Sequence, residues 1–357
     1  MIEIKDDFFK PRNFGSKSPS PAAPETGSKS FTLLSCHAKE PNCLPLTLSL
    51  VTHRRQTEQV MSLIPERFPV KHATELKIRV APDVNVRVLR RGPTTTPHPI
   101  FLLIHGLASN ARMWDGVGDA LASQGFASVA VDLRGHGHSD KPDTGYDFDT
   151  ICHDLCALLD ELHIERAIFV GQSWGGNIVV HAAHQHPDRV LACVPVDGGV
   201  IEIGQLFSKW EDCAERMKPP RLAGMRSGRL ESAIRATNTD WPESGIIGSL
   251  SNFAFHDDGT ISPWLTFERH MMILKELWLH QPSQMFPHIS RPVLFMPADS
   301  GDVNWTSNKE QAINFALEHL PNGRVHWFRP AHHDLHAQFP DRCAEVLVTH
   351  IQNGFFS

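Results

Sequence analysis

A single stretch, residues 168–177, constrains the fold of this chain more than any other. It reads Ile-Phe-Val-Gly-Gln-Ser-Trp-Gly-Gly-Asn, and an apolar-rich segment follows it as far as Pro187. The order is that of a buried strand, a sharp turn and a helix. Such a turn gives its central residue a positive φ and brings two backbones so close that only glycine fits on either side. Gly171 and Gly175 meet this requirement. The turn therefore lifts the Ser173 hydroxyl clear of the sheet, beside the free N–H groups that begin the helix.

Apolar runs elsewhere in the chain predict a mostly parallel sheet. Residues 76–80 and 84–88 alternate apolar and polar side chains around Pro82-Asp83, which is typical of an antiparallel hairpin. Continuously apolar runs, typical of strands buried on both faces, follow at 100–104, 127–131, 167–170, 191–196, 293–296 and 325–328. Helical patterns lie between them, near 113–124, 150–163, 175–186, 306–319 and 338–352. This alternation predicts an α/β fold with eight strands and helices on both faces.

One long insertion interrupts the alternation. Residues 200–286 show helical patterns but no parallel-strand pattern, and they carry Trp210, Trp241, Trp264 and Trp278. A segment inserted after the carboxyl end of a central strand lies over the ligand-binding edge of the sheet. We expect a helical cap at 200–286, with the core formed by 73–199 and 287–357. The alternative is that these aromatic residues form only the cap's own small core.

Residues 1–72 differ in composition from the rest of the chain. The stretch 11–30 is rich in Pro, Ser, Gly and Lys and has too little apolar surface to offset the entropy of folding. We expect 1–72 to be disordered or loosely attached, and Met61 is a hypothetical alternative start.

Composition and charge exclude several classes of protein. The formal net charge of −6 over 357 residues gives no basic surface for nucleic acid. No apolar run reaches the length of about 18 residues that a membrane span needs, and no secretory signal is recognisable. The seven cysteines include no Cys-x-x-Cys pair, which is typical of thiols in a reducing compartment. We expect a cytoplasmic protein that acts on a small molecule without a metal or cofactor, and its oligomeric state stays open.

A histidine follows the last predicted strand. Residues 328–336 read Phe-Arg-Pro-Ala-His-His-Asp-Leu-His. Because a neutral serine hydroxyl is a poor nucleophile, a base must accept its proton, and His333 is the predicted base. His332 and His336 are expected to cap or line the pocket. A metal site formed by His332 and His336 is the competing interpretation, but no carboxylate or cysteine completes the ligand set at the usual spacing.

Three carboxylates are candidates for the acid that orients this histidine and stabilises its charged form. Asp302 and Asp299 both follow the strand predicted at 293–296, and Asp302 is preferred for its distance past that strand. Asp197, at the end of the strand before the insertion, is a third option; its alternative role is that of a turn carboxylate.

Two backbone N–H groups are candidates for binding the negative charge that develops on a substrate oxygen. The Trp174 N–H comes directly after the serine. The Leu107 N–H, which follows His105-Gly106 at the end of an earlier buried strand, is the second. Losing one such donor typically costs about 3 kcal/mol of activation free energy.

Several motifs in this order resemble those of the α/β-hydrolase fold family, over roughly residues 75–353. They are His105-Gly106 followed by Trp114, the glycine-rich turn 132–139, the nucleophile elbow 171–175, and His333-Asp334-Leu335. The resemblance implies a Ser-Asp-His triad in that chain order. The region of the acid departs from the family's usual Gly-x-x-Asp, since residues 298–302 read Ala-Asp-Ser-Gly-Asp. His136 and His138 are interpreted as turn residues.

The resemblance also implies a reaction class. Serine at position 173 argues against haloalkane dehalogenases and epoxide hydrolases, which have aspartate there. We predict a serine hydrolase that cleaves a carboxylic ester or lactone with an apolar part. The alternatives are a hydrolase of carbon–carbon bonds in ring-opened diketones and, because Ser173-Trp174-Gly175 resembles proline iminopeptidases, a prolyl amidase. A protein that binds a small ligand under the cap without catalysis is the remaining alternative.

Overall fold

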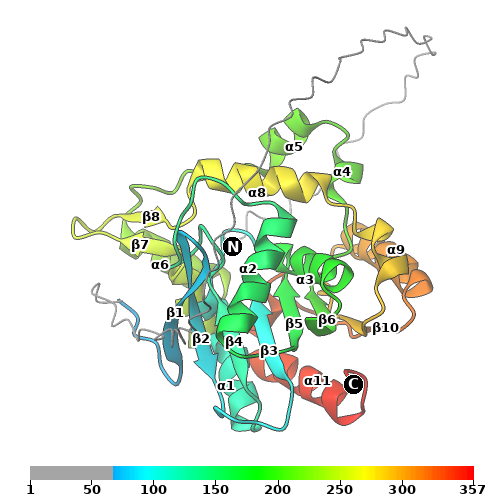
Figure 1. Ribbon diagram of the computed structural model, residues 1–357. Coiled ribbons are helices and arrows are strands. Elements are labelled where there is room, and N and C mark those ends of the chain that lie inside the picture. Colours follow the sequence, from blue (N-terminus) through cyan, green and yellow to red (C-terminus); the bar gives the residue numbers. More distant parts are fainter. Residues whose placement is uncertain (1–66) are drawn as a thin grey trace, which may run out of the picture. The chain divides into compact units, whose positions relative to one another are not determined.

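Eight strands form one sheet in the computed structural model, which describes residues 67–357 (Figure 1). Their order across the sheet is β1-β2-β4-β3-β5-β6-β9-β10. The bounds are Thr74–Ala81 (β1), Val84–Arg91 (β2), Ile100–Ile104 (β3), Ser128–Val131 (β4), Ala167–Gln172 (β5), Val190–Val196 (β6), Val293–Phe295 (β9) and Gly323–Val325 (β10). β2 pairs antiparallel with β1 and β4, and the other pairs are parallel. The predicted eight-stranded, mostly parallel sheet is confirmed.

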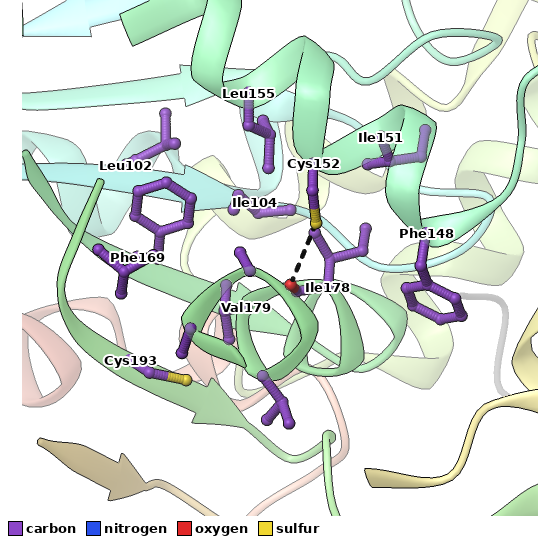
Figure 2. Close-up of a cluster of buried hydrophobic side chains, with 14 of the residues drawn as sticks. Leu102, Ile104, Phe148, Ile151, Cys152, Leu155, Phe169, Ile178, Val179 and Cys193 are labelled. Carbon is purple, nitrogen blue, oxygen red and sulfur yellow. Dashed lines mark hydrogen bonds between the residues drawn. The ribbon is translucent and has the colours of Figure 1, made fainter. Parts of the chain in front are cut away.

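Helices cover both faces of the sheet. Successive side chains of a strand point to opposite sides, so alternate residues of one strand pack against different helices. Leu102 and Ile104 of β3 belong to the apolar cluster that includes α2 (Phe148–Glu161) and α3 (Trp174–Gln185), as Figure 2 shows. Phe101 and Leu103 belong to the cluster on the other face, with α1 (Asp115–Ser123) and α11 (Pro340–Gln352). Two buried faces explain why the central strands are continuously apolar.

The contact between α2 and α3 is close. In Figure 2 the Cys152 thiol donates to the Ile178 carbonyl oxygen across 3.8 Å, between the side chains of both helices. Burial raises the pKa of Cys152 well above its usual range, so this thiol is a packing group. The packing fixes α3, and α3 carries the turn at residue 173 at its amino end.

The last strand lies earlier in the chain than predicted. β10 ends at Val325, whereas the prediction placed it at 325–328. The N–H groups of His326 and Phe328 still donate to carbonyl oxygens of the β9 segment, and Phe328 forms an isolated parallel bridge with Ala298. The hydrogen bonding therefore continues past the strand in an irregular form.

The insertion between β6 and β9 is mainly helical, as predicted. It contains α4 (Ile203–Leu206), α5 (Trp210–Met217), α6 (Ser227–Thr237), α7 (Glu243–Leu250) and α8 (Phe267–Leu279), with 3₁₀ turns at Pro282–Gln284 and Phe286–His288. It also contains a hairpin of β7 (Phe253–Phe255) and β8 (Ile261–Pro263) that the sequence did not predict. Strands of three residues are too short to show an alternating pattern.

Residues 67–72, which the prediction assigned to a loosely attached extension, bond to the core. Buried Arg112 donates from Nη1 to the Phe68 carbonyl oxygen, and Arg91 donates to that of Lys71 across 3.4 Å. The rest of the predicted extension, with Met61, lies outside the described residues. Among residues 67–357, no helix combines the length and apolarity needed to cross a bilayer.

Candidate active site

The turn between β5 and α3 has the strained geometry that the sequence predicts. Ser173 has φ 54° and ψ −117°, a conformation that costs a non-glycine residue free energy. A Cβ atom added to Gly171 would lie 2.0 Å from the Gly175 carbonyl oxygen, and one added to Gly175 would lie 2.6 Å from that of Ile104. Both glycines are therefore required by close backbone contacts. Ser173 stands at the carboxyl end of β5, immediately before the first N–H of α3.

His333 lies on the loop before α10 (Leu335–Gln338) and contacts Asp197. Its Nδ1 is 2.6 Å from Asp197 Oδ2. Burial by itself would raise the pKa of Asp197, but the Lys309 ammonium and the His333 ring outweigh that effect and lower the pKa to about 2. Asp197 is thus ionised and accepts the Nδ1–H, which leaves Nε2 of His333 for proton transfer. The His333 carbonyl oxygen accepts a bond of 3.3 Å from Gln172 Nε2, which links this loop to the serine turn.

The predicted pairing of His333 with Asp302 is wrong, and so is the alternative with Asp299. Asp302 is the N-cap of α9 (Val303–His319) and accepts the N–H groups of Asn304 and Trp305, each at 3.0 Å. Asp299 accepts from the Gly301 N–H and the Thr306 hydroxyl and pairs with Arg329. Both carboxylates thus bond to groups other than His333. Asp197, the third candidate, is the one that contacts the histidine.

Gly198 follows Asp197 directly in the sequence, but only the structure shows why glycine is needed there. A Cβ atom on Gly198 would lie 2.1 Å from the Ser173 carbonyl oxygen. The glycine is therefore needed because this turn lies against the serine turn, and a carboxylate one residue away lies close to the site. Asp197 itself has φ 42°, another strained backbone position at the same sheet edge.

His105 fixes the orientation of the peptide that carries the Leu107 N–H. Its Nδ1 donates to the Gly106 carbonyl oxygen at 2.7 Å, and its Nε2 accepts the Leu133 N–H at 3.0 Å. Burial lowers the pKa of His105, in agreement with a neutral ring that donates from one nitrogen and accepts at the other. In a trans peptide the C=O and the following N–H point in opposite directions. Holding Gly106 C=O against the ring thus turns the Leu107 N–H away from it.

These groups line one cavity of about 1000 Å³. Ser173, Trp174, Leu107, Asp197 and His333 all border it, together with many side chains of the insertion. The lining from the insertion is mainly apolar and includes Met217, Ile234, Trp241, Phe253, Trp264, Leu265, Phe267, Leu274 and Leu277. The cavity therefore combines a few polar groups at the sheet edge with a large apolar wall, as small-molecule sites do.

The tryptophans of the insertion divide into two pairs. Trp241 and Trp264 line the cavity. Trp210 and Trp278 pack against each other instead, with ring centroids 6.0 Å apart. Trp241 also packs in a buried apolar cluster with Leu230 and Ile246 of the insertion.

Comparison with known proteins agrees with this architecture. The family model of the alpha/beta hydrolase fold matches residues 99–242. A crystal structure of E-2-(acetamidomethylene)succinate hydrolase aligns with 79% of this chain and 100% of its own, with a TM-score of 0.67 and 22% sequence identity. The chain has the alpha/beta hydrolase fold.

Curated relatives of this α/β-hydrolase fold protein match over shorter segments. The chain is 39% identical over 99 residues to 2-(acetamidomethylene)succinate hydrolase of Mesorhizobium japonicum, which is 28% of this chain and 35% of the relative. It is 38% identical over 111 residues to epoxide hydrolase A of Mycobacterium tuberculosis, which is 30% of this chain and 34% of the relative. The matched segments span about a third of each relative's length.

Other histidines of this α/β-hydrolase fold protein have packing roles. His136 bonds through Nδ1 to the Arg134 carbonyl oxygen and stacks on Trp174, with centroids 5.5 Å apart. His336 is buried against Trp114, whereas His332 lines the cavity. Among residues 67–357, no group of three or more His, Cys, Asp or Glu side chains is arranged to hold a metal ion.

Proposed function

We propose that this protein is a serine hydrolase that cleaves a carboxylic ester or lactone with an apolar part through an acyl-enzyme. The observation that carries the proposal is the convergence of Ser173 with the bonded pair His333 and Asp197 at one cavity. These three residue types are the nucleophile, base and acid of acyl transfer. The curated relatives match over only about a third of their length. The proposal for the activity is therefore argued from the geometry of this site.

The proposed reaction proceeds in two halves. Ser173 Oγ attacks the substrate carbonyl carbon while His333 Nε2 takes the hydroxyl proton, and the Leu107 and Trp174 N–H groups bind the oxygen that becomes negative. The carbon–oxygen bond to the alcohol then breaks, and the alcohol leaves with the proton from His333. Water attacks the acyl-enzyme in the same way, releases the acid and restores the serine. Asp197 holds the ring tautomer and stabilises the charged imidazole throughout.

The cavity wall supports an apolar substrate. Aromatic and aliphatic side chains of the insertion face the serine turn across the cavity, and apolar walls of this kind take up apolar ligand surface. The relatives' printed names, a succinate-derivative hydrolase and an epoxide hydrolase, support hydrolysis as the reaction type without naming this substrate. Ser173 favours acyl chemistry within that type, because an activated serine attacks carbonyl carbons.

Covalent labelling tests the nucleophile. We expect a fluorophosphonate probe to modify wild-type protein on Ser173, and Ser173→Ala to remain folded and unlabelled. Ser300→Ala, at an exposed serine on the border of the same cavity, is the matched control and should be labelled like wild type. A wild-type protein that is folded but not labelled would contradict the proposal.

A substrate panel separates the reaction classes. We expect turnover of p-nitrophenyl esters and of lactones with apolar substituents. Turnover confined to ring-opened diketones, or to prolyl anilides, would favour one of the two alternative enzyme classes. Thermal stabilisation by such compounds with no turnover at all would favour a binding protein.

A further inference from the structure

A buried lysine contacts the carboxylate that holds His333. Lys309 lies on α9, its side chain is 8% exposed, and it borders the cavity. Its Nζ is 2.7 Å from Asp197 Oδ1 and 2.8 Å from the Ala298 carbonyl oxygen. Burying an ammonium is costly unless it is paired and hydrogen-bonded. This pairing therefore ties Lys309 to the candidate acid.

The three groups form a row across the Asp197 carboxylate. Lys309 binds Oδ1 and His333 binds Oδ2, while the Ala298 N–H donates to Oδ1 at 2.9 Å. The bonds to Oδ1 fix the plane of the carboxylate, so the direction in which Oδ2 meets the imidazole is also fixed. The negative charge of Asp197 is thus shared between the Lys309 ammonium and the imidazole that takes up the serine proton in the proposed reaction.

This arrangement has an electrostatic consequence for the base. A nearby positive charge disfavours a second one, so Lys309 opposes protonation of the His333 and Asp197 pair. Without it, the carboxylate charge would act on the imidazole alone and the pair would bind a proton more tightly. The lysine therefore keeps the His333 and Asp197 pair able to accept the serine proton at a lower pH.

We propose that Lys309 is a positioning residue of this site, which orients Asp197 and extends the activity of the His333 and Asp197 pair to lower pH. The inference rests on the proposed function, since it concerns the same triad. Lys309 acts through Asp197, which distinguishes it from the groups that meet the substrate.

Other titratable and charged groups near the His333 and Asp197 pair are unchanged when Lys309 is replaced. His332, Asp334 and His336 lie on the histidine's own segment, and Asp299 with its partner Arg329 lies near Lys309. A change of Lys309 alone therefore isolates the effect of its charge.

The experiment measures kcat/KM for an ester against pH in wild type, Lys309→Met and Lys309→Arg. The acidic limb is the part of this profile in which kcat/KM falls as the pH is lowered. In Lys309→Met the acidic limb should move up by about one pH unit, the lower end of the effect of a neighbouring charge. Below the limb, this shift is about a tenfold loss of kcat/KM relative to wild type. Lys309→Arg keeps the charge and should keep the limb. Lys275→Met, at an exposed lysine on α8, is the matched control for removing a charge elsewhere.

The outcomes are distinct. An unmoved limb in Lys309→Met overturns the inference, and so does a higher KM at every pH with the limb unmoved, which would make Lys309 a substrate contact. If Lys309→Met does not fold, Lys309→Gln removes the charge while keeping a donor and is read in the same way. Fluorophosphonate labelling of wild type separates the two proposals. An unlabelled wild type would contradict the proposed function. A labelled wild type, with the acidic limb of Lys309→Met unmoved, would contradict only the inference about Lys309.

Discussion

His333 Nδ1 and Asp197 Oδ2 lie 2.6 Å apart, although 136 positions separate the two residues in the chain. β6, which Asp197 follows, has β5 on one side and β9 on the other. The carboxyl ends of these parallel strands meet at one edge, where Ser173 stands at the end of β5 and the histidine loop follows β10. The order of the strands therefore allows a carboxylate from either of two turns, the one after β6 or the one after β9, to pair with the histidine.

Separate replacements of Asp197 and Asp302 should distinguish the roles of these two carboxylates. Asp197→Asn should lower kcat by on the order of 10³–10⁴-fold, because an amide no longer selects the ring tautomer or stabilises the imidazolium. Asp302→Ala should leave kcat close to wild type and lower the free energy of unfolding by about 1 kcal/mol, since it removes only a helix cap. Steady-state kinetics and urea unfolding of both variants check this. The reverse pattern would restore Asp302 as the acid.

The stability contributed by Asp197 should depend on pH in a defined direction. Its pKa is lowered from the ordinary 3.8 to about 2, so the stabilisation is present above about pH 4 and is lost as the pH falls through about 2. The difference corresponds to about 2 kcal/mol. The gap in unfolding free energy between wild type and Asp197→Asn should therefore narrow by about that amount on acidification. Urea titrations from pH 5 downward measure it, and a constant gap would contradict the shift.

Removing the histidine that holds the Gly106 peptide should lower kcat more than it changes KM. His105→Phe keeps an aromatic ring but loses the bond to Gly106 C=O, so the Leu107 N–H is no longer fixed. Loss of one donor to a developing oxyanion lowers kcat about 10²–10³-fold, which is the upper limit expected here. His181→Phe, a buried ring bonded to Asp149, is the control. Equal losses in both variants would point to a general packing defect.

The glycine after Asp197 should tolerate no side chain. In Gly198→Ala the new Cβ would lie 2.1 Å from the Ser173 carbonyl oxygen, so one of two strained turns must move. We expect a loss of unfolding free energy of at least about 2 kcal/mol together with loss of labelling at Ser173. Gly125→Ala, unlike Gly198→Ala, places alanine at a positive φ, but nothing lies within 4 Å of its Cβ, so it should cost only about 1 kcal/mol. Thermal unfolding of the two variants gives the comparison, and similar losses would show that the contact of Gly198 with Ser173 costs no more than an unfavourable φ elsewhere.

Short-range patterns predicted much of this molecule. The parallel strands and the helices between them were found because central strands buried on both faces are continuously apolar. The serine turn was found because its strain and its close backbone contacts restrict two positions to glycine. The histidine loop followed from its place between the last strand and the last helix. The shifted β10 and the β7–β8 hairpin were missed because strands of three residues show no usable period.

The serine turn, the position of the histidine loop and the succession of strands along the chain were thus predicted from the sequence alone, since each depends on residues that are neighbours in the chain. The partner of His333, the lysine behind that partner and the contact of Gly198 with the serine turn were decided only by the tertiary structure. They depend on how far each strand extends before its loop begins and on which side chain reaches across the shared edge. A sheet brings together residues more than a hundred positions apart, and distances of a few ångströms between them are set by packing, which no local pattern encodes.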